Sequence, residues 1–120
     1  MSREKKRLLV SELIIKVLTQ KLCVREALLM FPKNNFDPSI QVAWHALIHY
    51  EADEDMRYMD LEFKEEQDEF LYFLSNLLRT NQNIPKNILD DYNAWHGGTP
   101  IRVEENTWWG KFIALFRFIT

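Results

Sequence analysis

The sequence predicts an all-α protein, a compact bundle of about five or six helices forming a single domain over residues 1–120. Apolar residues recur three and four positions apart along most of the chain, and regular alternation of apolar and polar residues is absent. The 3 glycines and 4 prolines are too few for a turn-rich all-β protein, and a hydrophobic content of 47% is too high for a disordered chain. A length of 120 residues fits one domain.

Two helices are predicted in the N-terminal third of the chain. The first covers roughly residues 4–19, and the second covers residues 24–31 and ends before Pro32 and the polar run that follows it. Each helix has apolar residues on one face: Val10, Leu13, Ile14, Val17 and Leu18 in the first, and Val24, Ala27, Leu28 and Phe31 in the second.

A central antiparallel helical hairpin is predicted at about residues 38–57 and 61–79. Asp37 followed by Pro38 is a strong start signal, because a carboxylate caps the first turn and proline suits the first helical position. On one straight helix the apolar faces of the two halves would be about 140° out of register, which favours a turn near residues 58–60. We therefore expect Trp44 and Leu74 to be buried against each other across the hairpin.

The C-terminal part predicts a short helix over residues 85–95, an extended stretch over residues 99–103 and an aromatic helix from about residue 107. The last helix carries more large apolar side chains than one small domain is expected to cover. It is interpreted as core, as an interface with a protein partner or a second copy, or as a membrane-surface helix. The interface candidates are Trp108, Trp109, Phe112, Phe116 and Phe118.

Charge is unevenly distributed along the chain. Residues 1–33 carry a net charge of +5 and residues 34–80 carry −8, within a total of −3. A basic helix packed beside an acidic hairpin explains this asymmetry, and contact between one protomer's basic end and another's acidic hairpin is the alternative. The mildly acidic total gives no support to nucleic-acid binding.

The cellular location follows from what the sequence lacks. A signal peptide and an apolar run long enough to cross a membrane are both missing, and the single cysteine, Cys23, excludes an internal disulfide framework. We therefore expect a cytoplasmic protein, and no residue pattern predicts a cofactor.

A metal site is one hypothesis for the polar segment around residue 49. His45 and His49 are four residues apart on one helix face, the spacing that presents two imidazoles to one metal ion, and Asp53 continues the row. The glutamate of the zinc-protease motif is missing between the two histidines. Half-buried histidines that hydrogen-bond to a neighbouring helix would produce the same pattern, so both interpretations stay open.

A carboxylate site is the second hypothesis for the hairpin. Glu51 and Asp55 continue the apolar stripe of the first hairpin helix, and Glu66 flanks the stripe of the second. A turn about residue 59 would bring these three candidate catalytic carboxylates together near the closed end of the hairpin. Buried charges need a partner, so the alternative is an open bundle end in which these groups form structural salt bridges.

A resemblance to a known family arises at the same residues. The segments Glu51-Ala-Asp-Glu54 and Glu65-Glu-Gln-Asp68 resemble in outline the paired E-x-x-E and E-x-x-D motifs of all-α nucleoside-triphosphate pyrophosphohydrolases of the MazG type. The resemblance covers these eight positions and implies Mg²⁺ held by carboxylates on two facing helices. The helical wheel turns Glu65 and Asp68 toward water, and we do not assign the chain to that family.

Three functions remain as hypotheses. The leading one is a small cytoplasmic helical protein that acts through protein–protein contact, including contact with a second copy through the C-terminal helix. The second is a metal-dependent hydrolase that uses the acidic residues of the hairpin with His45 or His49. The third is a peripheral membrane protein anchored by residues 107–119.

Overall fold

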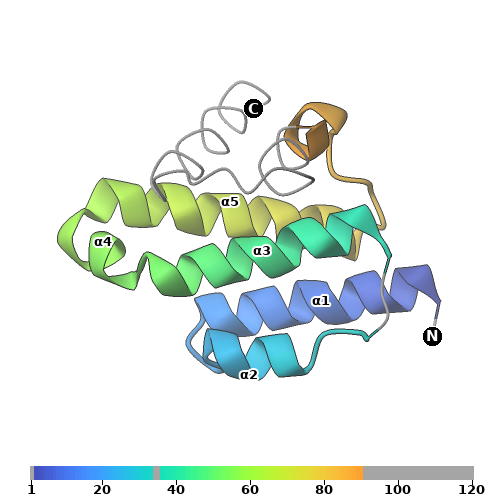
Figure 1. The fold of residues 1–120 in the computed structure, drawn as a ribbon, viewed down its shortest axis with the longest axis horizontal. Helices are drawn as coiled ribbons and strands as arrows, with labels where there is room; N and C mark the ends of the chain where they lie inside the picture. The colour runs from blue at the N-terminus through green and yellow to red at the C-terminus, as the bar shows by residue number, and fades with distance from the viewer. Residues whose placement is uncertain (1, 34–35, 91–120) are drawn as a thin grey trace.

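The computed structural model describes residues 2–33 and 36–90, and this part of the chain is helical, without strands (Figure 1). The all-α prediction is therefore confirmed. A further helical segment is described over residues 86–90, where the sequence predicts a helix. The later predictions, including the interface candidates Trp108, Trp109, Phe112, Phe116 and Phe118, lie outside the described residues. The helices are α1 (Arg3–Leu18), α2 (Val24–Leu29), α3 (Pro38–Ala52), α4 (Glu54–Met59) and α5 (Leu61–Arg79).

Three helices begin at a side chain that caps their first turn. Ser2 accepts a hydrogen bond from the backbone N–H of Lys5 at 3.2 Å at the start of α1. Asp37 and Asp60 accept equivalent bonds from residues 39 and 63, at 3.1 and 3.2 Å, at the starts of α3 and α5. These caps satisfy N–H groups that have no partner within the helix, and they explain why each helix begins where it does.

The long helices α1, α3 and α5 form the body of the bundle. In Figure 1, α5 runs antiparallel to both α1 and α3, and α2 lies against the outer side of α1. The packing of α5 is most extensive along α1. The hydroxyls of Ser11 and Ser75 are 2.8 Å apart, and two such small buried residues let α1 and α5 approach closely.

The core is formed by the apolar faces that the spacing predicts. Its members on α1 and α5 are fully or almost fully buried, and Ile84 and Ile88 extend the core beyond the end of α5. The core residues of the three long helices are Val10, Leu13, Ile14 and Val17 on α1, Ile40, Val42, Ala43, Ala46 and Leu47 on α3, and Phe70, Leu71, Leu74 and Leu78 on α5.

The first half of the predicted hairpin differs from expectation in two ways. The predicted helix over residues 38–57 is interrupted at Asp53, which separates α3 from the short helix α4. The buried face of α3 is also rotated, because alanines at positions 43 and 46 allow neighbouring helices to approach there. Leu74 is buried as predicted, but Trp44 is 36% exposed and packs edge-on against Phe31 of the α2–α3 loop, with ring centroids 5.4 Å apart.

A buried arginine joins three separate segments of the chain. The guanidinium of Arg7 donates to both carboxylate oxygens of Asp37, at 2.7 and 3.1 Å. It also donates to the side-chain oxygens of Asn83 and Asn81, at 2.8 and 3.3 Å, in the segment after α5. The N-terminal helix, the start of α3 and the end of α5 are thereby held together at one end of the bundle.

Ion pairs also connect the basic and acidic parts of the chain within one molecule. Arg7 of α1 pairs with Asp37, and Arg25 of α2 pairs with Glu51 of α3 at 3.4 Å. These contacts agree with the interpretation of the charge asymmetry as packing within one domain. Among the described helices, none combines the length and the apolar composition that crossing a membrane requires.

Candidate functional site

The candidate catalytic and metal-binding residues lie on and between α3, α4 and α5, most of them near the α4 end of the bundle, where these helices meet. Asp53 is the residue at which α3 stops, and its side chain is buried. The amide nitrogen of Gln67, a fully buried residue of α5, donates to the Asp53 carboxylate at 3.1 Å. Asp53 thus continues the buried face of α3, which the sequence analysis assigned to Glu51 and Asp55.

The other end of the Gln67 amide is also engaged. Its oxygen accepts a hydrogen bond of 3.1 Å from the guanidinium of Arg57 on α4. The same guanidinium donates to the backbone carbonyl of Tyr50 and lies over the Tyr50 ring, 3.5 Å from its centroid. Arg57 therefore holds α4 against both α3 and α5, with a cation–π contact added to its hydrogen bonds.

The pKa of Tyr50 is raised by its surroundings at this end of the molecule. Burial and the nearby Asp68 carboxylate together raise the pKa of Tyr50 to about 12, against the opposing charge of Arg57. The Tyr50 hydroxyl donates to Asp68 at 3.1 Å, and Lys64 pairs with the same carboxylate at 2.7 Å. At neutral pH Tyr50 is a protonated hydrogen-bond donor, which suits a structural role better than a role as a general base.

The three candidate catalytic carboxylates do not face the core together. Asp55 is exposed, Glu51 is half-buried and pairs with Arg25, and Glu66 is half-buried on α5. The expectation that Glu51 and Asp55 continue the core-facing stripe is wrong, because that stripe follows the alanines of α3 to Asp53. Asp68, expected to face water, contacts Tyr50, whereas Glu65 is exposed as expected.

The candidate metal ligands form part of the helix packing. His45 is half-buried, and its Nδ1 lies 3.1 Å from the carbonyl oxygen of Gln41 one turn earlier. His49 is half-buried and Asp53 is buried. Within residues 2–33 and 36–90, no three side chains of His, Cys, Asp or Glu are placed to hold a metal ion.

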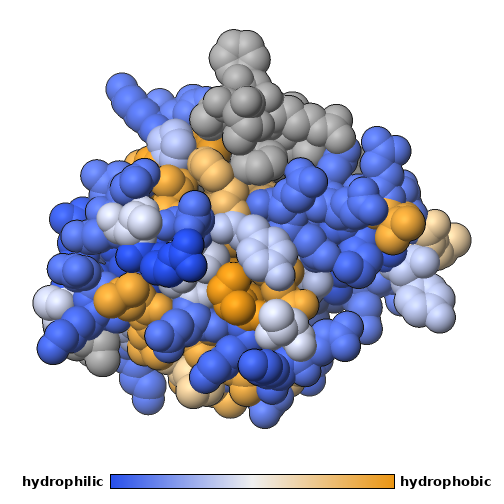
Figure 2. All heavy atoms as spheres, turned by 180° about the vertical axis from the view of Figure 1, so that it is seen from behind, coloured by the Kyte–Doolittle hydropathy of each residue, from blue (hydrophilic) through white to orange (hydrophobic). Residues whose placement is uncertain are grey.

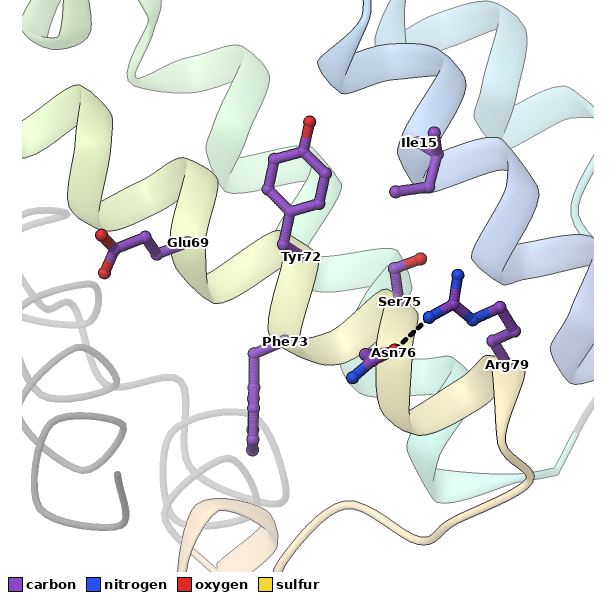
Figure 3. A pocket seen from close by; sticks show the side chains of 7 residues that line it. All are labelled: Ile15, Glu69, Tyr72, Phe73, Ser75, Asn76 and Arg79. Carbon is purple, nitrogen blue, oxygen red and sulfur yellow. Dashed lines mark hydrogen bonds between the residues drawn. The ribbon is translucent and has the colours of Figure 1, made fainter.

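An open groove of about 500 Å³ lies between α1 and α5 (Figure 3). Ile15 and Tyr72 form its walls, and the Arg79 guanidinium donates to the side-chain oxygen of Asn76 along one side. The hydroxyl of Ser75 turns toward α1, where Ser11 satisfies it. Ser75, Asn76 and Arg79 are engaged in these hydrogen bonds, and Figure 3 shows the Glu69 carboxylate directed away from them. The polar groups of the groove therefore do not converge on a space for a ligand.

A second hollow of about 420 Å³ lies where α1, α2 and α3 come together, and it contains Cys23 and Glu51. Cys23 occupies the position before α2, and its backbone N–H donates to the Glu26 carboxylate at 3.1 Å. Hydrogen bonds from the Cys23 backbone and side chain lower the pKa of Glu26. The thiol takes part in the first turn of α2, and this capping geometry explains its position without a catalytic role.

Sequence reasoning missed an apolar surface at the turn between α4 and α5. Tyr58, Met59 and Leu61 are 93%, 86% and 68% exposed, and the adjacent Met56 is 39% exposed. We call these four residues the apolar tip. In Figure 2 the α4 end is at the right edge, where orange and tan side chains protrude beside hydrophilic ones. The signal available in the sequence was a run of large apolar residues inside a turn, where polar residues are usual.

No family model, curated protein or solved structure matches this chain. Neither an activity nor a partner can be transferred from a relative, and the resemblance to MazG-type pyrophosphohydrolases gains no support from these comparisons.

Proposed function

We propose that this protein acts through protein–protein contact, and that the apolar tip is its binding surface. The observation that carries the proposal is the exposure of Tyr58, Met59 and Leu61 at the junction of α4 and α5. A group of large exposed apolar side chains surrounded by polar residues is typical of interaction sites on soluble proteins. Tyrosine and methionine are both enriched at such interfaces.

The scaffold beneath the apolar tip supports this role. The buried hydrogen bonds among Asp53, Gln67 and Arg57 fix α4 against α5, and Asp60 caps the first turn of α5. The tip residues, three on α4 and one at the start of α5, are therefore presented at an anchored junction of two helices. A rigid presentation reduces the entropy lost when a partner binds.

The proposal includes a cytoplasmic location. Cys23 is exposed as a free thiol, and a free surface thiol suits a reducing compartment. The enzyme hypothesis has no described metal site or convergent pocket to support it, so we do not carry it forward as a second function.

Site-specific photo-cross-linking in the native host tests the proposal. A photoreactive phenylalanine analogue replaces Tyr58 in one strain and the exposed Lys5 of α1 in a control strain. We expect a discrete protein adduct from position 58, absent from position 5, and suppressed when Met59→Glu is combined with the probe. No adduct at position 58, or equal adducts at both positions, would contradict the proposed binding surface.

A further inference from the structure

We propose that the apolar tip binds a positively charged amphipathic segment of another protein. This inference rests on the proposed function and specifies the chemistry of the partner at the same surface. Three observations support it: the tip is flanked by carboxylates, the nearby cations are engaged in other contacts, and a membrane surface or a second copy of the chain fits the tip less well.

The chain around the apolar tip is strongly acidic. Residues 51–69 contain ten acidic and two basic residues, a net charge of −8. Six of the acidic side chains are exposed: two on α4, three on the first half of α5 and Asp60 between the two helices. These exposed carboxylates are Glu54, Asp55, Asp60, Glu62, Glu65 and Glu69.

The two cations of this region are engaged elsewhere. Arg57 binds the Gln67 amide and the Tyr50 carbonyl, and Lys64 pairs with Asp68. Glu54, Asp55, Glu62 and Glu65 form no ion pair with another residue of the described ranges 2–33 and 36–90. Their charge is therefore available to a partner, and it flanks the apolar tip in sequence and on the helices.

An apolar centre with a carboxylate rim fits a segment with apolar and basic residues on one face. The apolar residues would bury the side chains of Tyr58 and Met59, and lysine or arginine residues would reach the rim. The flexible thioethers of Met56 and Met59 can adapt to different apolar shapes, as in methionine-rich surfaces that bind amphipathic helices. The surface would thus recognise a segment by the spacing of its apolar residues and by the basic residues beside them.

Other occupants fit less well for electrostatic reasons. A membrane with anionic lipids would repel the carboxylates that surround the tip. Two apolar tips from two copies of this chain would bring two carboxylate rims together, and like charges in register oppose association. A second copy could instead contribute residues 107–120, which contain two basic and no acidic residues, so the experiment includes a measurement of self-association.

Isothermal titration with two designed peptides tests the inference on the full chain. One 18-residue peptide has leucine and lysine at helical spacing, and the other has glutamate in place of every lysine. We expect the lysine peptide to bind and the glutamate peptide to bind at least about tenfold more weakly, because only the first complements the rim. The dissociation constant should rise about tenfold between 50 and 300 mM salt, because salt screens exposed charges.

Matched variants locate the binding surface. Met59→Glu and Leu61→Glu should each weaken binding at least about tenfold, whereas Met30→Glu and Leu29→Glu on exposed positions of the α2 region should leave it within about twofold. Glu62→Gln should weaken binding and reduce its salt dependence, and Glu12→Gln on α1 should change neither. Circular dichroism and thermal unfolding show that each variant is folded before it is titrated.

The possible outcomes separate this inference from the proposed function. Binding of neither peptide, or equal binding of both, would overturn the positively charged partner, while a specific adduct at position 58 would leave the proposed function intact. Unchanged binding by Met59→Glu would overturn the assignment to the tip. Self-association that Met59→Glu abolishes would identify a second copy as the occupant, and binding to anionic vesicles in place of peptide would identify a lipid surface; either result overturns the inference.

Discussion

Replacing Arg7 should destabilise the protein more than any other single change in a charged residue of α1. Its side chain is 2% exposed and that of its partner Asp37 is 7% exposed, with a shorter N–O distance of 2.7 Å. Arg7→Met removes the charge and retains an unbranched side chain of similar reach. The substitution leaves the almost enclosed Asp37 carboxylate with only the exposed Arg3, 3.8 Å away, as a counter-charge. It also leaves the side-chain oxygens of Asn81 and Asn83 without this donor.

The magnitude follows from the burial of the pair. Removing one partner of a buried ion pair costs about 3–5 kcal/mol, because the remaining charge loses its compensation. A domain of this size has a free energy of unfolding of about 5–15 kcal/mol, so the variant should fold but unfold at much lower urea concentration. Arg3→Met is the matched control. Arg3 is 62% exposed and 3.8 Å from the same carboxylate, so its loss should cost less than about 1 kcal/mol.

Urea unfolding followed by circular dichroism measures these differences. A double-mutant cycle with Asp37→Asn isolates the pair, since asparagine retains the capping oxygen and removes the charge. We expect a coupling energy of at least about 1.5 kcal/mol between the two positions. An Arg7→Met variant within about 1 kcal/mol of the wild type would refute the argument that this buried pair holds α1 to α3.

The pH dependence gives an independent check on the same pair. Burial raises the pKa of Asp37, but the Arg7 hydrogen bond, the Ser39 N–H and the charges of Arg7 and Arg3 together lower it below its ordinary value of 3.8. A carboxyl whose pKa is lower in the folded state stabilises the fold above its unfolded pKa, and this contribution is lost as the pH falls through the folded pKa. The wild type should therefore lose stability below about pH 4, and Asp37→Asn should lose less over the same range.

Three further predictions concern single aromatic residues. Tyr50 should ionise at about pH 12, because its pKa is raised. Stability should therefore fall as the pH rises from about 10 to about 12. An absorbance titration in which Tyr50→Phe removes no group that ionises near pH 12 would contradict this. Trp44→Ala should lower the free energy of unfolding in urea by about 2 kcal/mol. This is less than the roughly 3–5 kcal/mol expected for an enclosed aromatic side chain, because Trp44 is 36% exposed. A loss above about 4 kcal/mol would contradict this and indicate an enclosed side chain. If the helix that the sequence predicts from about residue 107 is an interface, the chain should sediment as a dimer, and Trp109→Ala or Phe118→Ala should shift it toward monomer. A wild-type monomer at about 100 μM would exclude this.

The parts of the fold that local rules control could be predicted from the sequence. Asp37 and Pro38 announce the start of α3, because capping and the fixed backbone angle of proline act within one turn. The second hairpin helix was predicted over residues 61–79, and α5 covers Leu61–Arg79. Its amphipathic pattern is strong, with the polar and apolar faces clearly separated, so packing and local preference agree there.

The end of α5 shows where residue preferences alone are insufficient. The chain leaves the helix at Asn81, which has a positive φ of 56° and whose side-chain oxygen also accepts from Arg7. Asparagine tolerates this conformation better than most residues. The contact with Arg7, however, spans 74 positions in sequence, and a contact of that kind cannot be derived from neighbouring residues.

The buried face of α3 could not be predicted because small residues decide it. The apolar stripe was assigned to Ile40, Trp44, Leu47 and Ile48 by their size, yet Trp44 and Ile48 are partly exposed. Alanines 43 and 46 are fully buried, since small side chains permit the closest approach of neighbouring helices. The spacing of large apolar residues predicts that an amphipathic helix forms. The volume of the side chains at the helix contact decides which face of that helix is buried.

The same rotation determines what the acidic end of the hairpin can do. With the packing face following the alanines, Asp53 is the acidic residue carried inward, and Gln67 meets it with an amide that donates at one end and accepts from Arg57 at the other. An amide can bridge a carboxylate and a guanidinium because it offers both a donor and an acceptor. Through this bridge the one buried carboxylate of the region has a hydrogen-bond partner. The carboxylates of Glu54, Asp55, Glu62 and Glu65 are left exposed. The acidity that the sequence concentrates in the hairpin is therefore displayed around the apolar tip, where a positively charged partner can reach it.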